Sequence, residues 1–201
     1  MLQAQSTRNR GARRGVGIEM AWRALALMVL TVIVAQIAPA AASSPHAGQA
    51  ATCARQSGAG FPGAYTSRDN LVLGPLSMIG AGRYTSSATV HEFGGNKFPV
   101  LVRPGHTVRL VLSRRANRSA SLFYGGENGG APTETRVSDG RRSITFRACS
   151  ARRAQSDADG EPVTFWSGFV VVSKPMCVHV KAWIDAERTP RRGHIALGRR
   201  C

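Results

Sequence analysis

The sequence predicts an all-β fold, a single β-sandwich of immunoglobulin-like or similar Greek-key type over residues 69–201. Three observations predict it. About nine or ten short apolar or alternating runs follow one another at the spacing of sandwich strands, separated by turn-forming residues. After residue 43 no segment keeps an amphipathic helical period beyond two turns. A region of about 130 residues suits one core between two packed sheets.

Residues 1–42 predict an export segment, a signal peptide or membrane-anchor helix, ahead of this domain. Five arginines and one acidic residue lie in 1–23, an uncharged apolar run follows, and small residues come next. This is the order of a signal peptide, with cleavage expected after Ala40 or Ala42. An uncleaved membrane anchor is the alternative, although the uncharged run falls short of about 20 apolar residues. Either way, residues beyond 43 are expected outside the cytoplasm, secreted or in the cell envelope.

The first half of the exported part predicts a lead-in and then strands. Residues 43–68 are small and rich in Gly and Ser, which indicates a flexible segment. "NLVLGPLSMIGA" contains two apolar runs broken at Gly74-Pro75, and "SSATVHEF" (86–93) predicts a short strand before a turn. The clearest predicted hairpin is "KFPVLVRPGHTVRLVLS" (97–113), with its turn at Pro104-Gly105.

The second half continues as strands and loops. "SASLFYGG" and "SITFRACS" each predict a strand, and a loop is expected at 125–132. "VTFWSGFVVVS" and "MCVHVKAWID" predict two long β-rich runs joined at Lys174-Pro175. The aromatic residues Trp166, Phe169 and Trp183 are expected in the core or at its rim.

The cysteines predict two disulfides. They are Cys53, Cys149, Cys177 and Cys201, an even number beyond the export segment, and exported cysteines pair by default. The sequence alone leaves three pairings open. Strand alternation places Cys149 and Cys177 each opposite the apolar residues of its strand, which favours a bond between them near the sheet rim. We therefore expect Cys149–Cys177 and Cys53–Cys201.

The spacing of Cys177 and His179 raises the alternative of a metal-binding or redox protein. Residues two apart in a strand share a face, here with Lys181 and Trp183, so both side chains could ligate one ion. Zinc sites carry further paired ligands at close spacing, and blue-copper sites add a second His and often a Met. The sequence completes neither pattern, so no metal or other cofactor is expected.

Catalytic motifs are lacking in the sequence. The G-x-S-x-G elbow and the H-E-x-x-H helix do not occur, and the acidic turn at 157–161 lacks the ligands of a calcium loop. We therefore expect no catalytic residues and a non-enzymatic binding or structural protein. A hydrolase with an unrecognised site is a further alternative.

The formal net charge of +16 favours anionic partners, such as an acidic polymer of the envelope or a membrane surface. The basic residues form scattered doublets and no long block, which we attribute to an arginine-rich composition. Too few aromatic residues interleave with the cations for single-stranded nucleic acid, so no specific nucleic-acid binding is expected. The doublets begin at Arg114, Arg141, Arg152, Arg191 and Arg199.

Taken in order, "NLVLGPLSMIGA", "FPVLVRPGHTVRLVL", "ITFRACS", "TFWSGFVVV", "PMCVHVKAWID" and "ALGRRC" resemble a family of exported, uncharacterised actinobacterial proteins. The resemblance covers about residues 70–201 and lies in the order of the set, not in one motif. It implies export and a bacterial envelope context, and it implies no activity and no site residue.

Overall fold

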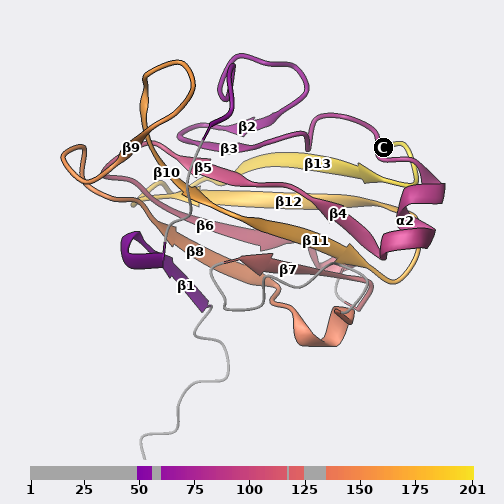
Figure 1. Cartoon of the computed structure of the whole chain (residues 1–201). Helices are drawn as coiled ribbons and strands as arrows, with labels where there is room; N and C mark the ends of the chain where they lie inside the picture. Colours follow the sequence, from indigo (N-terminus) through magenta and orange to yellow (C-terminus); the bar gives the residue numbers. More distant parts are fainter. Residues whose placement is uncertain (1–48, 56–59, 117, 125–134) are drawn as a thin grey trace, which may run out of the picture. The chain divides into compact units, whose positions relative to one another are not determined.

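A computed structural model of the chain describes residues 49–55, 60–116, 118–124 and 135–201. The predicted export segment, with Ala40 and Ala42, and the predicted loop at 125–132 lie outside these residues. Within them thirteen strands form three open sheets with one short α-helix, which confirms the all-β class (Figure 1).

Sheet A holds the longest strands. In spatial order these are β1 (Gln49–Thr52), β8 (Ser143–Arg147), β6 (Thr107–Leu112), β12 (Met176–Ile184) and β13 (Arg191–Leu197). The β1 strand runs parallel to β8, and the other neighbours are antiparallel. Thus part of the stretch expected to be a flexible lead-in supplies an edge strand. Along β12 the burial alternates, as the sequence predicts for a strand with one solvent face.

Sheets B and C complete the described strands. Sheet B has the order β2 (Leu71–Leu73), β3 (Leu76–Met78), β5 (Val100–Val102), β10 (Pro162–Trp166), β9 (Gln155–Ser156). Sheet C has the order β4 (Gly95–Lys97), β11 (Gly168–Val172), β7 (Ala120–Tyr124).

One continuous ribbon joins sheets B and C. Val100 lies opposite Trp166 in sheet B and Lys97 opposite Phe169 in sheet C, so both pairings share one register. Between them the Phe98 N–H donates to Gly168 O at 3.0 Å. The ladder breaks beside Pro99, which has no N–H to donate. The run predicted as one strand from "VTFWSGFVVVS" is therefore two strands, β10 and β11, in two sheets.

All three sheets share one hydrophobic core. Each sheet supplies one aromatic ring to its centre: Phe146 of sheet A lies 5.4 Å from Tyr124 of sheet C and 5.2 Å from Trp166 of sheet B, between ring centroids. Trp166 and Phe169 are buried, as predicted, whereas Trp183 is 36% exposed. A second cluster lies on the other face of sheet B, where Leu101, Val163 and Phe165 are buried with Ala64, and Phe61, Tyr65 and Ile79 pack against it.

The predicted hairpin over 97–113 is wrong. Its turn exists, with Gly105 at φ +78°, but β5 pairs with β3 and β10 while β6 pairs with β8 and β12. The chain therefore passes from one sheet to another at this turn. The physical reason lies in burial: β5 is buried on both faces, between the core and the second cluster, whereas β6 keeps a solvent face. A hairpin does form at β2–β3, where Gly74 takes φ +65°.

The strand predicted over 86–93 is also wrong, because Ser87–Phe93 forms the helix α2. Ser86 caps its start, since its Oγ accepts a hydrogen bond from the Thr89 N–H at 3.0 Å. Gly94 ends it at φ 66°, with its N–H donating to Val90 O. The two caps stabilise the helix by more than the β-branched residues of this short segment favour a strand. Among the described residues, no helix combines the length and apolar character needed to cross a membrane.

All four cysteines form disulfides, but the predicted pairing is wrong. The bonds are Cys53–Cys149 and Cys177–Cys201. The parallel pairing of β1 with β8 brings Cys53 to Cys149, with Cα atoms 4.9 Å apart, and β13 returns Cys201 to Cys177 at 5.2 Å. Each bond thus ties one edge strand of sheet A to its inner neighbour. Two disulfides are typical of an extracytoplasmic protein.

Candidate functional site

The solvent face of sheet A carries one cation from each of four neighbouring strands. Arg147 comes from β8, Arg109 from β6, Lys181 from β12 and Arg192 from β13. Arg109 and Lys181 lie on the side opposite the core, because their strand neighbours on either side are buried. Arg192 lies opposite Lys181 and so shares its side. Arg147 follows the buried Phe146 and lies opposite the exposed Thr107. We call this surface the basic face.

The register brings these side chains into cross-strand rows. Lys181 lies between Val111 of β6 and Arg192 of β13, and Trp183 lies opposite Arg109. Side chains directly opposite in an antiparallel pair stand about 5 Å apart at Cβ, so these are neighbours in space. The face thus combines cations with one exposed aromatic ring. The alternation of β12 predicted the outward side of Lys181 and Trp183, and sheet pairing supplies the other members.

The cations of the basic face have no ion pair with any described residue. The ion pairs that form are Arg83–Asp69, His106–Asp185 and Arg191–Glu187. Of these acids, Asp185 lies at the end of β12 and is already engaged, since its Oδ2 is 2.7 Å from His106 Nδ1 and its Oδ1 accepts from the Thr107 N–H. Like charges on adjacent strands repel one another, so an anion bound here would lower that repulsion.

Near one end of this face lies a hollow with a volume of about 290 Å³. We call it the basic hollow; its polar lining residues are Ser113, Arg114, Arg115, His179, Lys181 and Arg192. Arg114 and Arg115 begin the 3₁₀ turn η3 (Arg114–Ala116), which is separated from the end of β6 by one residue, Ser113. None of the described residues that line the hollow is acidic. Both residues of the arginine doublet at 114 and one residue of the doublet at 191, Arg192, therefore line the same hollow, although they look scattered in the sequence.

Cys177 and His179 lie on one face of β12, as the alternation predicts. Cys177 Sγ is 3.6 Å from His179 Nε2, and His179 lies opposite His194 of β13. The sulfur is bonded to Cys201, however, and a disulfide sulfur is not the thiolate that binds metals. No group of three or more His, Cys, Asp or Glu side chains among the described residues is arranged to hold a metal ion.

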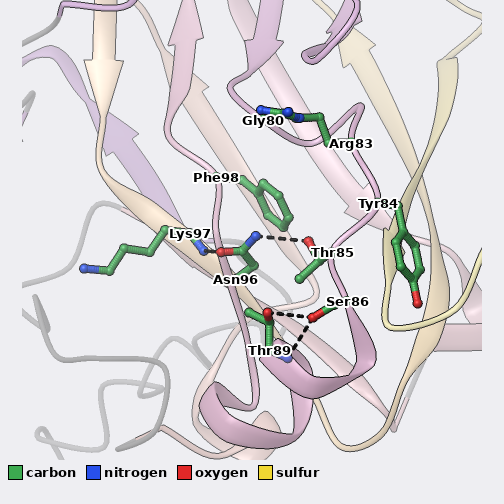
Figure 2. A pocket seen from close by; sticks show the side chains of 9 residues that line it. All are labelled: Gly80, Arg83, Tyr84, Thr85, Ser86, Thr89, Asn96, Lys97 and Phe98. Carbon is green, nitrogen blue, oxygen red and sulfur yellow. Dashed lines mark hydrogen bonds between the residues drawn. The ribbon is translucent and has the colours of Figure 1, made fainter.

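A second depression, of about 340 Å³, lies beside the start of α2 (Figure 2). Its polar side chains largely bond one another. Asn96 Nδ2 donates to Thr85 Oγ1 at 3.0 Å, and Asn96 Oδ1 accepts from the Lys97 N–H at 2.8 Å (Figure 2). Ser86 Oγ is likewise 2.8 Å from Thr89 Oγ1. Because these groups already have partners, this depression offers a ligand fewer free donors than the basic hollow does.

The residues predicted from sequence thus fall into three groups. The four cysteines are structural, Ala40 and Ala42 lie outside the described residues, and His179 lines the basic hollow. The sequence analysis attributed the arginine doublets to composition and did not predict that Arg114, Arg115 and Arg192 line one hollow. Comparison with protein-family models, curated proteins and solved structures finds no match to this chain.

Proposed function

We propose that this chain is a non-enzymatic, extracytoplasmic binding protein whose basic face holds an anionic polymer of the cell envelope. The observation that carries the proposal is the set of four outward cations on adjacent strands with no ion pair among the described residues. The two disulfides support an extracytoplasmic location, because such bonds persist in oxidising compartments.

A flat sheet face suits an extended ligand with repeated charge. Neighbouring strands lie about 4.8 Å apart, and outward residues along one strand about 6.8 Å apart, so the cations form a grid at these spacings. A polymer crossing the strands would meet Arg147 or Arg109, then Lys181, then Arg192. Each exposed contact is weak, and the sum depends strongly on salt.

The single exposed ring on the face favours an envelope polymer over single-stranded nucleic acid, which needs several stacking aromatics. The positions of the other exposed apolar side chains favour the polymer over a membrane surface. The other exposed large apolar side chains, Val72, Tyr84 and Phe93, lie on β2, before α2 and at the end of α2, away from the basic face. Among the described residues the basic face therefore offers a bilayer only one exposed apolar side chain, Trp183.

The fold proposed for this function is a β-sandwich. Sheet A would form one layer, and sheets B and C, joined along their common ribbon, the other. The shared core supports this, because the buried residues of all three sheets belong to one cluster. In such a sandwich the basic face of sheet A stays free for a ligand.

The test is binding of poly(glycerol phosphate) to the purified protein, with dextran as the uncharged comparison. Arg109→Gln combined with Arg147→Gln should weaken polymer binding about tenfold. Arg68→Gln combined with Arg152→Gln removes the same charge from exposed loop positions and should leave binding nearly unchanged. Equal losses in both double variants would mean a general charge effect. Tighter binding to single-stranded DNA or to anionic vesicles would reassign the partner.

The metal-binding or redox alternative has one observation in its favour, the 3.6 Å contact between Cys177 Sγ and His179 Nε2. It requires that the Cys177–Cys201 bond be opened, which exposes two thiols beside His179 and His194. Titration of zinc into reduced and oxidised protein separates the two hypotheses. One equivalent bound only after reduction, and lost with His179→Ala, would establish the alternative.

A further inference from the structure

We infer that the basic hollow is a discrete subsite for a single tetrahedral oxoanion, the phosphate group of the bound polymer. The inference rests on the proposed function for its polymer, but the hollow can be tested with inorganic phosphate alone. It assigns the hollow a role distinct from the rest of the basic face: the face provides distributed attraction, and the hollow holds one charged group in place.

The lining cations converge on the hollow from three separate segments. Arg114 and Arg115 come from η3, Lys181 from β12 and Arg192 from β13. The Lys181–Arg192 pairing places two of them directly opposite each other. Charges that arrive from several directions suit a tetrahedral group, whose oxygens point in several directions, better than a planar carboxylate. Guanidinium groups also bind phosphate through two parallel hydrogen bonds.

The electrostatic balance of the hollow is incomplete without an anion. Within the described part of the chain, no acidic side chain lines it and none of its four permanent cations has an ion pair. Lys181 is half-buried, so water screens its charge less than that of a fully exposed lysine. An oxoanion in the hollow would replace repulsion among these cations by attraction.

A buried hydroxyl at the hollow supplies a second, independent sign. Ser113 Oγ is buried and has no hydrogen-bond partner among the described residues. Ser113 lies on the outward side of sheet A, opposite His179, and both line the hollow. Buried hydroxyls are normally paired, so one without a partner calls for an explanation. Rotation of the Ser113 side chain about its Cα–Cβ bond would turn this hydroxyl toward a phosphate oxygen in the hollow, which would accept its hydrogen bond.

The size of the hollow fits one group with its attached chain. Its volume of about 290 Å³ corresponds to about ten water molecules of liquid. A bare oxoanion would leave room for water, and a phosphodiester unit of a polymer would displace more of it. The rest of that polymer could then continue across the sheet toward Trp183 and Arg109, which lie further along the same face.

The test follows inorganic phosphate binding to the protein by amide NMR at constant ionic strength. The amide signals of His179 and Gly193 should shift with saturation in phosphate, and the melting temperature should rise with phosphate more than with chloride. Sulfate shares the charge and shape, so a sulfate arm shows whether the hollow selects phosphate. Acetate should bind at least tenfold more weakly than phosphate.

Two matched double variants decide the outcome. Arg114→Gln with Arg192→Gln should abolish saturable phosphate binding, whereas Arg109→Gln with Arg147→Gln, on the face but outside the hollow, should retain it. Phosphate shifts that persist unchanged in the first variant, or no saturable shift in the native protein, would overturn the inference. If the polymer binds but phosphate does not, the inference fails alone. If phosphate binds in the hollow but the polymer does not bind, the proposed function fails alone.

Discussion

At the residue scale, Asp185 shows how one acid is kept from neutralising the basic face. It follows β12 with φ 47°, a left-handed conformation that aspartate tolerates better than most residues. Its carboxylate accepts the Thr107 N–H and contacts His106 Nδ1, and these two interactions, the first larger, lower the pKa of Asp185. The acid therefore stays ionised and bound at the end of the sheet.

This predicts an acid-dependent loss of stability. Because the folded-state pKa lies below the unfolded value of about 3.9, the stabilisation is complete above that value and is lost as pH falls through the folded pKa. Asp185→Asn should lower the free energy of unfolding at pH 7, by less than about 1 kcal/mol because the carboxylate is largely exposed. The variant should also lose less between pH 4 and pH 2. Urea unfolding across pH measures both, with exposed Glu161→Gln as control; an unchanged pH profile would contradict the assignment.

Tyr124 provides a second prediction at this scale. Its buried hydroxyl donates to Phe98 O at 2.8 Å, and burial raises the pKa of the phenol, so it stays a donor at alkaline pH. Tyr124→Phe leaves that carbonyl without this partner and should cost about 1–3 kcal/mol in the free energy of unfolding. Tyr84→Phe, at an exposed ring, should change it little. Denaturant melts of the two variants make the comparison.

At the element scale, the pairing of β11 with β7 depends on Gly168, the first residue of β11, because glycine has no side chain. A Cβ on Gly168 would overlap the ring of Tyr124 and the carbonyl oxygen of Phe123. Neither the backbone nor a packed ring can give way cheaply, and the clash falls beside the break where the ribbon passes from sheet B to sheet C.

Gly168→Ala should therefore destabilise the protein by about 2–3 kcal/mol, as overpacking of a core does. Gly60→Ala is the matched control, because a Cβ there meets nothing within 4 Å. Thermal unfolding of both variants measures the difference. If the two alanine variants melted alike, β11 and β7 would not approach as closely as the structure has them.

At the scale of the whole molecule, the two disulfides differ in the loops that they close. Cys53–Cys149 spans a sequence separation of 96 and Cys177–Cys201 one of 24. On the chain-entropy estimate the longer loop contributes about 4.7 kcal/mol and the shorter about 3.4 kcal/mol. Replacing Cys53 and Cys149 by serine should thus lower stability more than replacing Cys177 and Cys201. Non-reducing peptide mapping checks the pairing itself, and a Cys149–Cys177 peptide would refute it.

Sequence and structure agree along β12 but not at 86–93, where two helix caps override the predicted strand. The alternation of β12 correctly placed Cys177, His179, Lys181 and Trp183 on one side. The disulfide pairing could not follow from it, because the partners are set by β1 joining β8 in parallel across nearly a hundred residues. In the same way, the predicted hairpin joined strands that are adjacent in sequence but lie in separate sheets.

The candidate site was still less accessible from sequence. Arg192 lies beside Lys181 only because β13 folds back on β12, and Arg114 joins them only because η3 follows the outward end of β6. No spacing in the chain marks these residues as neighbours. From the sequence alone, an arginine-rich composition therefore accounts for the doublets as well as a binding site does. The sheet order is what distinguishes the two explanations.

The two edge disulfides also determine how the described strands would carry mechanical load. A pull applied at Cys53 and at Cys201 passes through each bond, so the residues between Cys53 and Cys149, and those between Cys177 and Cys201, bear no tension. Only the segment from Cys149 to Cys177 can lengthen, to about 95 Å from end to end at full extension. Four strands of sheet A, with Arg109, Arg114, Lys181 and Arg192, lie in the shielded loops. Under load the strands β10 and β11, which lie between Cys149 and Cys177, would therefore leave the shared core first, while the strands of the basic face stay tethered by the two bonds.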